Sequence, residues 1–379
     1  MTKANNSISM REKNRLLILN LIRKNPISRA DISRVTGLTR AAVTIITDAL
    51  IDDGIIKVGE TLKSESGRRP TLLYLNPDAY ASVGIDISRD GCYVAFTDFV
   101  GKSIFREKID YQESADDTVN LICDVVLSEL RNHNFITTAL GVCVCAPGPI
   151  DFRSGTILNP VGLELFHGYN IIDALSAKIG LHVYLEKDAN VLAIAEKNSD
   201  DINTDMLLLL ADHGIGCSVI KDGRIFRGRD GMGCEIGHTT IDVNGELCSC
   251  GNVGCAEIYA SIPATVRRAG EKSWDALIEK AKAGDQISYE ALKYQGKILA
   301  TLCVNAANLF EVESIVLGGR LAEGDFLLNP IINESLQKTA FSRRVHGYKV
   351  SSSRLGDGAR AYAASIAVTE KYFNGELAL

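Results

Sequence analysis

One histidine and three cysteines lie close together in the stretch "GHTTIDVNGELCSCGNVGC" at residues 237–255. They supply one nitrogen and three sulfurs, a set that zinc favours in closed tetrahedral sites. A catalytic zinc keeps one position open for water, and the CxC-x4-C spacing differs from that of a DNA-binding finger. We therefore predict a structural zinc site; the alternative is four core residues without a metal, although the glycines of the stretch indicate a looped backbone. The predicted ligands are His238, Cys248, Cys250 and Cys255.

Length and composition describe a large soluble chain. Its 379 residues predict two or three domains. No run approaches the roughly 20 apolar residues that span a bilayer, and the N-terminus lacks the order of a secretory signal. We expect a cytoplasmic protein without a membrane partner. The other cysteines are scattered through apolar segments and are expected to be reduced core residues: Cys92, Cys123, Cys143, Cys145, Cys217, Cys234 and Cys303.

Charge is distributed unevenly along the chain. Residues 1–79 carry 13 Lys and Arg against 8 Asp and Glu, a net charge of +5. Because the whole chain has a net charge of −6, residues 80–379 carry −11. A basic head on an acidic body predicts an anionic partner for the head alone.

The head has the pattern of a winged helix-turn-helix. A helical repeat in "REKNRLLILNLIRKN" is stopped by Pro26, Ser28 is a candidate N-cap for a second helix, and Gly37 ends that helix. A third helix is predicted in "TRAAVTIITDALIDDG", followed by two β-rich segments around a polar tip. The last helix of this motif enters the major groove of DNA.

The third helix has one apolar face and one polar face. Val43, Ile46 and Leu50 share the apolar face, which is expected to pack. The predicted partner is double-stranded, palindromic operator DNA; the alternative is a three-helix protein-docking module with a solvated basic face. The predicted DNA contacts are Thr39, Arg40, Thr44 and Thr47 on the helix and Arg68 and Arg69 on the wing.

The body alternates strands and helices in two similar halves. Three antiparallel strands are predicted from residue 81, then a helix at about 115–132 and a buried strand. A second hairpin follows residue 205, and later helices and the strand "SIVLGG" complete the pattern. Two lobes that each begin with a hairpin indicate a duplicated α/β architecture with a ligand cleft between the lobes.

The segment "CEIGHTTID" followed by "CSCGNVGCAE" resembles the ROK family of sugar kinases and sugar-responsive repressors. With its winged head, the whole chain resembles the repressor branch, the NagC/Mlc/XylR type, and "DHGIG" at 212–216 is also similar to that branch. The resemblance implies an α/β two-lobe, actin-like (ribonuclease-H-like) fold, a homodimer or tetramer, and a sugar in the cleft. The expected domains are the head at 1–79, a first lobe at 80–190 plus 357–379, and a second lobe with zinc and dimerisation at 191–356.

The same resemblance places the sugar contacts on Glu235, His238 and Glu257, and the family's catalytic base on Asp188. Carboxylates accept hydrogen bonds from vicinal hydroxyls, and His238 can give one ring nitrogen to zinc and the other to a hydroxyl. Simpler readings remain open for two of them. Asp188 follows a strand, so its role could be limited to capping a helix. The role of Glu257 could be limited to a favourable interaction of its carboxylate with a helix dipole.

Two further positions depart from the family. Lys187 stands where the kinases usually have an asparagine; it could pair with Glu186 or Asp188, or it could favour an anionic sugar phosphate. Asn159 lies in a loop that differs from the usual Asn-and-Trp loop, and it is retained as a candidate sugar contact.

The kinase phosphate hairpin is degraded. The family's Asp-x-Gly-Gly-Thr corresponds to "DISRD" at 86–90, where only Asp86 remains. Ser88 and Arg89 add side chains where phosphate must approach the backbone, and Asp90 adds a like charge. The second turn, "DHGIGC", has lost the family's threonine and a later glycine. We therefore expect no kinase activity.

The sequence as a whole predicts a zinc-containing repressor of carbohydrate metabolism genes. A sugar or sugar phosphate in the cleft would alter operator affinity. One alternative is an ATP-dependent ROK sugar kinase with an appended DNA-binding domain. A second is a scaffold that docks a sugar-transport protein.

Overall fold

The computed structural model describes residues 7–61, 71–89, 91–199, 205–229, 231–356 and 358–377. The chain divides into two compact units. Unit 1 comprises residues 1–144, 171–184 and 364–379, and unit 2 comprises residues 145–170 and 185–363. The head and most of the predicted first lobe thus share unit 1. The segments 145–170 and 185–190 of that predicted lobe belong to unit 2. Among the described helices, none is long and apolar enough to cross a membrane.

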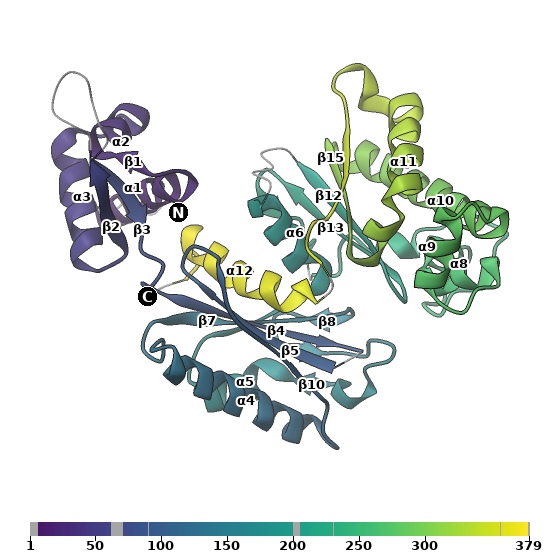
Figure 1. The fold of residues 1–379 in the computed structure, drawn as a ribbon, viewed down its shortest axis with the longest axis horizontal. Coiled ribbons are helices and arrows are strands. Elements are labelled where there is room, and N and C mark those ends of the chain that lie inside the picture. Colours follow the sequence, from purple (N-terminus) through teal and green to yellow (C-terminus); the bar gives the residue numbers. More distant parts are fainter. Residues whose placement is uncertain are drawn as a thin grey trace. The chain divides into compact units, whose positions relative to one another are not determined.

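The head contains three helices, drawn in purple in Figure 1. They are α1 (Ser7–Lys24), α2 (Arg29–Thr36) and α3 (Arg40–Asp52). Ser28 caps α2, since its hydroxyl accepts a hydrogen bond from the Asp31 backbone N–H at 3.2 Å. Gly37 ends α2 with a φ of 73°, in the left-handed region that favours glycine. Both helix boundaries were expected from the sequence.

A small sheet completes the head. Its strands are β1 (Ile27–Ser28), β2 (Ile56–Thr61) and β3 (Thr71–Leu75), in the order β1-β3-β2. β2 and β3 are antiparallel, as a wing requires. The predicted wing-tip contacts Arg68 and Arg69 lie outside the described residues.

The first large sheet has the order β11-β7-β4-β5-β6. Its strands are β4 (Ala81–Ser88), β5 (Gly91–Asp98), β6 (Ser103–Ile109), β7 (Ala139–Ala146) and β11 (Val183–Lys187). β4, β5 and β6 pair antiparallel, as expected. Two helices, α4 (Ala115–Asn132) and α5 (Ile171–Ile179), cover one face, and α12 (Ala359–Phe373) covers the other (Figure 1). Ser82 of β4 and Thr369 of α12 are joined by a buried hydrogen bond of 2.8 Å.

The second large sheet has the order β14-β13-β12-β15-β16. Its strands are β12 (Met206–Ala211), β13 (Ile215–Lys221), β14 (Arg224–Ile225), β15 (Ser314–Gly318) and β16 (Lys349–Ser352). The accompanying helices are α6 (Asp188–Ser199), α8 (Ile262–Ala269), α9 (Trp274–Lys282), α10 (Gln286–Phe310) and α11 (Asp325–Thr339). Leu207, Leu209, Ile315, Trp274 and Leu299 belong to one buried apolar cluster between sheet and helices. Burial of such side chains is the main stabilising contribution of this unit.

Short elements carry the loops of unit 2. The strands β8 (Ile150–Asp151), β9 (Thr156–Ile157) and β10 (Tyr169–Asn170) form a small sheet of their own. The helix α7 (Ala256–Ala260) and the 3-10 turns η1 (Glu164–Phe166), η2 (Ile236–His238), η3 (Gly319–Gly324) and η4 (Phe341–Arg344) lie in the connections. η2 and α7 frame the histidine- and cysteine-containing stretch.

Candidate functional site

The exposed face of α3 carries most of the predicted DNA contacts. Val43 and Leu50 are buried against the rest of the head, as predicted, whereas Arg40 and Thr44 are exposed. Thr39 is exposed as well and caps the helix, because its hydroxyl accepts from the Ala42 backbone N–H at 3.2 Å. The helix therefore presents its N-terminal end, where recognition helices contact base edges.

The prediction that Thr47 faces DNA is wrong. Its side chain is 0% exposed, and its hydroxyl accepts a hydrogen bond of 2.8 Å from Nε of Arg29 on α2. Thr47 lies close enough to the buried face for the neighbouring helix to cover it. The sequence analysis also missed Ile45, which is 63% exposed beside Thr44. An apolar side chain on such a face can contact a thymine methyl group.

His238, Cys248, Cys250 and Cys255 converge in unit 2. Their ligand atoms all lie within 4.8 Å of one another. The Cys250 and Cys255 sulfurs are 3.7 Å apart, as are the Cys248 sulfur and His238 Nδ1. A tetrahedral zinc with Zn–S bonds of about 2.3 Å would hold its ligands about 3.8 Å apart. The donor set and its spacing therefore fit a closed tetrahedral metal site.

Hydrogen bonds of the loop hold these ligands in place. The Cys248 backbone N–H donates to the Asn252 carbonyl at 2.8 Å, and Asn252 Nδ2 donates to the His238 carbonyl at 3.1 Å and to the Cys255 sulfur at 3.3 Å. Gly254 has a φ of 70°, and a Cβ there would collide with the Asp242 carbonyl oxygen. Only glycine allows this tight return of the chain. Such outer contacts fix the ligand orientations of a metal site.

Glu235 and His238 are held at the two ends of one turn. The His238 backbone N–H donates to the Glu235 carbonyl at 3.1 Å across η2. His238 Nδ1 faces the Cys248 sulfur, which leaves Nε2 for a second partner. The Ala256 backbone N–H donates to the Thr239 carbonyl at 3.1 Å, so the start of α7 is tied to the end of η2.

Glu257 lies in the first turn of α7 and reaches β13. Its Oε2 accepts from the Ile215 backbone N–H at 2.9 Å. A Cβ at Gly214 would collide with the same carboxylate, so the glycine of "DHGIG" makes room for it. The carboxylate is thus directed at the turn between β12 and β13. An interaction of Glu257 with the helix dipole alone would not need this contact with β13.

Lys187 pairs with Glu235. Its side chain is only 11% exposed, and its ammonium forms an ion pair with Glu235 Oε1 and lies 3.4 Å from the Gly233 carbonyl. The suggested pairing with Glu186 or Asp188 is therefore wrong. Glu186 instead accepts from Arg227 Nε at 2.9 Å and Nη2 at 2.6 Å.

Asp188 begins α6 beside Lys187. Its Oδ1 accepts from the Ala189 backbone N–H at 2.7 Å, and its Oδ2 is 4.0 Å from Nε of Arg360. Arg360 Nη2 also lies 3.3 Å from Asp212 Oδ2, in the second phosphate turn. Sequence reasoning missed Arg360, because only the fold brings this distant residue to the other two.

Asn159 is exposed in the loop that follows β9. Within the described part of the chain, no hydrogen bond joins its side chain to the other candidate sugar residues. The contacts above link Lys187 to Glu235, and link the turn of Glu235 and His238 to the start of α7, where Glu257 lies. Asp188 is next in sequence to Lys187. Asn159 makes no described contact with these residues.

The ROK family model matches residues 82–371, and a model described as winged helix-turn-helix DNA-binding matches residues 11–57. The chain belongs to the ROK family. It is 29% identical to a protein named xylose repressor from Caldicellulosiruptor bescii over 93% of this chain and 94% of that one. It is 28% identical to the Escherichia coli K12 protein named DNA-binding transcriptional dual regulator NagC, over 93% of this chain and 91% of that one.

Solved structures give the same fold. A ROK family transcriptional regulator described as a homologue of Escherichia coli MLC matches with a TM-score of 0.83 and 24% identity over 97% of both chains. A ROK hexokinase from Thermus thermophilus matches 78% of this chain and 100% of its own, with a TM-score of 0.68 and 24% identity. This ROK protein therefore has the actin-like two-lobe α/β fold preceded by a winged helix-turn-helix domain.

The first hairpin of this ROK protein is filled by its own side chains. Asp86 is 2% exposed, and the hydroxyl of Ser88 donates to the Gly91 carbonyl at 3.0 Å. The Tyr111 hydroxyl donates to the Ser88 carbonyl at 2.5 Å. Asp90 lies outside the described residues. The hydroxyls of Ser88 and Tyr111 thus engage backbone carbonyls of the hairpin, and Ser88 places a side chain where the family's phosphate hairpin has glycine.

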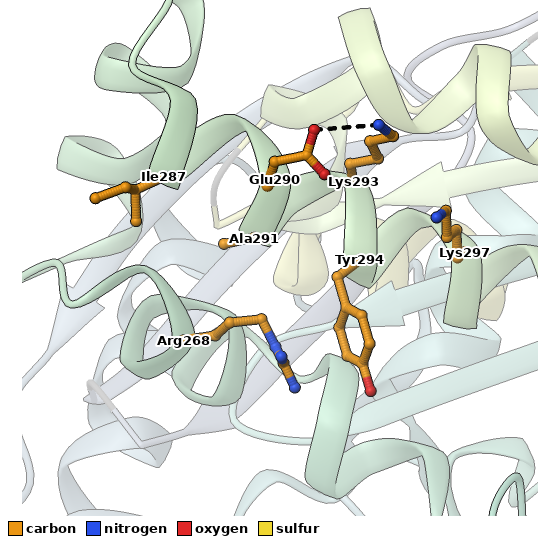
Figure 2. A pocket seen from close by; sticks show the side chains of 7 residues that line it. All are labelled: Arg268, Ile287, Glu290, Ala291, Lys293, Tyr294 and Lys297. Carbon is orange, nitrogen blue, oxygen red and sulfur yellow. Dashed lines mark hydrogen bonds and ion pairs between the residues drawn. The ribbon is translucent and has the colours of Figure 1, made fainter.

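A separate cavity of about 330 Å³ lies between α8 and α10 (Figure 2). The Arg268 guanidinium lies 3.6 Å from the centre of the Tyr294 ring, and Lys293 pairs with Glu290 at 3.1 Å. The residues lining the cavity include none of the candidate sugar or metal residues. The candidate sugar residues therefore lie outside this cavity.

The head contacts the end of α12 within unit 1. Arg15 Nη2 donates to the Tyr372 hydroxyl at 3.0 Å, and Asn20 Nδ2 donates to the Phe373 carbonyl at 2.9 Å. Arg23 forms an ion pair with Glu370. Burial raises the pKa of Tyr372 to about 12, so its phenol stays protonated near neutral pH. The helix that begins beside Arg360 thus ends against α1.

Proposed function

We propose that this ROK protein is a sugar-responsive transcriptional repressor that acts on operator DNA in the cytoplasm. The observation that carries the proposal is the combination of two features in one chain. One is the exposed N-terminal end of α3, with Arg40 and Thr44, in a basic winged head. The other is the group of Glu235, His238 and Glu257 around η2 and α7. Relatives named xylose repressor and N-acetylglucosamine repressor support this reading.

The effector in this proposal is a sugar or a sugar phosphate. Carboxylates and an imidazole nitrogen are hydrogen-bonding partners for vicinal hydroxyls. The Lys187 ammonium already has a carboxylate partner in Glu235, so an anionic ligand would have to compete with that ion pair. Calorimetric titration with a sugar and its phosphate decides between them: equal affinities would remove the anionic role of Lys187.

Zinc has a structural role in this proposal. It would be held by His238, Cys248, Cys250 and Cys255, where it would fix the loop between Glu235 and Glu257. All four positions of a tetrahedral ion are then filled by protein, so the metal shapes the site and does not act on a ligand.

Ligand binding would act by a population shift. A sugar that binds the closed lobes more tightly than the open ones favours the closed state. In a homodimer or tetramer, closure would change the separation of the two winged heads. Palindromic DNA accepts only half-site spacings near whole helical turns, so operator affinity would change.

Kinase activity is the second candidate, because ROK kinases share the fold and the family resemblance places their catalytic base on Asp188. The filled hairpin at Ser88 and the acidic Asp212 in the second turn weigh against a site for ATP phosphates. Phosphorylation of any hexose by ATP, lost in Asp188→Asn, would establish the kinase and refute the proposal on this point.

Replacing Arg40 with alanine should weaken operator binding and leave sugar binding intact. A base-contacting arginine contributes roughly 1–3 kcal/mol, so we expect about a tenfold to hundredfold increase in Kd. The measurement is fluorescence anisotropy with DNA selected from a random pool by the wild-type protein. Arg131→Ala, an equal loss of charge on α4 of the body, is the matched control. Equal affinities for Arg40→Ala and wild type would count against α3 as the reading helix.

Thr44 and Thr47 should respond differently to the same substitution. Thr44→Val removes an exposed hydroxyl and should weaken operator binding several-fold, whereas Thr47→Val should leave affinity unchanged. Thr47→Val loses the hydrogen bond from Arg29, which should cost about 1 kcal/mol of folding free energy. Thermal melting and anisotropy on the same samples separate the two effects. Loss of affinity in Thr47→Val without loss of stability would restore the original prediction for Thr47.

A further inference from the structure

Two cysteines outside the metal cluster lie next to the candidate sugar site. Cys217 is on β13 and is 6% exposed, whereas Cys234 lies in the loop immediately before Glu235 and is partly exposed. The other cysteines outside the cluster are buried, as expected for core residues. Cys234 is thus the exception to the prediction that these seven cysteines are core residues.

The Cys217 thiol is hydrogen-bonded to the backbone of Cys234. The Cys217 sulfur is 3.1 Å from the Cys234 carbonyl oxygen, and the Cys234 sulfur is 3.5 Å from the Phe226 carbonyl oxygen. The buried Cys217 sulfur therefore lies against the backbone of the partly exposed Cys234. A disulfide requires this kind of proximity before any large backbone movement.

Cys234 also has an unusual backbone conformation. Its φ is 63°, in the left-handed region that favours glycine. Residues held in this region by their surroundings cluster at functional sites. Glycine would adopt this backbone conformation more easily, so the presence of cysteine indicates a role for its thiol.

The surroundings shift the pKa values of the two thiols in opposite directions. The hydrogen bond from Cys217, assisted by the positive charge of Lys187, holds the pKa of the Cys234 thiol below its usual value despite burial. The hydrogen bond with Cys234 and burial raise the pKa of Cys217 well above its usual value. Low-pKa, accessible thiols beside a second cysteine are the ones that oxidants attack.

We propose that Cys234 and Cys217 form a peroxide-sensitive dithiol pair. The Cys234 thiolate attacks one oxygen of hydrogen peroxide, the O–O bond breaks, and the departing hydroxide takes a proton to become water. Cys234 is then a sulfenic acid. The Cys217 sulfur attacks the Cys234 sulfur, the S–O bond breaks, and the hydroxide leaves as water with the Cys217 proton. Two thiols and one peroxide thus give one disulfide and two waters.

Oxidation would reach the sugar site through the chain itself. Cys234 precedes Glu235, and Lys187 contacts both the Glu235 carboxylate and the Gly233 carbonyl. A disulfide ties this segment to β13 and removes the thiolate next to Lys187. We expect sugar affinity to change at least several-fold on oxidation, a consequence that rests on the proposed function, whereas the chemistry of the pair does not.

The test oxidises the full-length, zinc-loaded protein with increasing hydrogen peroxide, followed by alkylation and peptide mapping. A chromogenic chelator reports released zinc in parallel, because the cluster cysteines are the competing targets. The expected result is a Cys217–Cys234 disulfide at peroxide concentrations below those that release zinc. Oxidation of Cys248, Cys250 or Cys255 with the Cys217 and Cys234 thiols still free would overturn the proposal.

Two variants assign the roles within the pair. Cys217→Ser should leave a sulfenic acid on Cys234 that dimedone traps, and Cys234→Ser should slow thiol loss at Cys217 at least tenfold. Cys123→Ser, a cysteine of α4, is the matched control and should oxidise at Cys234 as wild type does. Dimedone labelling at Cys217 in place of Cys234 would contradict the assignment. If a variant fails to fold, the peptide map of the wild-type protein alone still decides whether the pair forms.

Discussion

Cys248→Ser should abolish the proposed sugar response and leave operator binding of the ligand-free protein within about twofold of wild type. The substitution removes one of the four metal ligands, and a structural zinc contributes about 10 kcal/mol or more to ordering its own loop in zinc-finger peptides. That loop joins Glu235 and His238 to Glu257, so the sugar contacts lose their mutual geometry. The head belongs to unit 1 and these residues belong to unit 2, so we expect the head to keep its exposed α3 face.

The measurements for this variant are zinc content, a thermal-shift titration with sugar, and anisotropy with operator DNA. Cys303→Ser is the matched control, because Cys303 is fully buried in α10 of the same unit and belongs to the apolar core. The control should retain one zinc per chain and the sugar-induced thermal shift, with only a lower melting temperature. A Cys248→Ser protein that still responds normally to sugar would refute a metal-shaped sugar site.

Glu235→Gln should raise the Kd for the effector by roughly tenfold to a hundredfold. The loss corresponds to a hydrogen bond with a charged partner, about 1.5–3 kcal/mol. The change also removes the carboxylate that neutralises Lys187, an ammonium with a side chain only 11% exposed, so a lower melting temperature is expected. Calorimetric titration and operator binding, each measured well below the melting temperature, distinguish lost recognition from lost folding.

Glu246→Gln provides the matched control for this prediction. Glu246 is an exposed residue of the same loop, so the substitution makes the same change of charge without touching the Lys187 pair. It should bind sugar as wild type does. Equal weakening in both variants would indicate a general effect of charge on the loop and not a direct contact with Glu235.

Local patterns in the sequence predicted most of the fold. The head helices were expected from Ser28, Gly37 and the helical spacing of apolar residues, because caps and amphipathic faces act within one or two turns. The two strand-rich lobes followed from alternation and turns in the same way. The domain boundaries near residues 145 and 185 had no such local signal, since they depend on which distant segments pack together.

In the candidate site, too, contacts between residues close in sequence could be predicted, whereas contacts between distant residues could not. The convergence of the four candidate metal ligands could be predicted because they lie within eighteen residues, so chain connectivity brings them close. The partner of Lys187 could not, because Glu235 reaches it across 48 positions of sequence. Thr47 was misassigned because helical spacing defines a face but not how far a neighbouring helix such as α2 extends over it. Arg360 and the contact between Cys217 and Cys234 likewise arise from tertiary structure.

The most direct test of the central claim is operator affinity measured with and without sugar. Thermal shift first identifies which sugars or sugar phosphates stabilise the purified protein, since a bound ligand raises stability with the logarithm of its concentration over Kd. Fluorescence anisotropy then measures the Kd for operator DNA at saturating ligand. We predict that the stabilising ligand changes this Kd at least tenfold in the wild-type protein, and that Glu235→Gln needs roughly tenfold to a hundredfold more ligand for the same change. A ligand that stabilises the wild-type protein but leaves operator affinity the same would contradict the account.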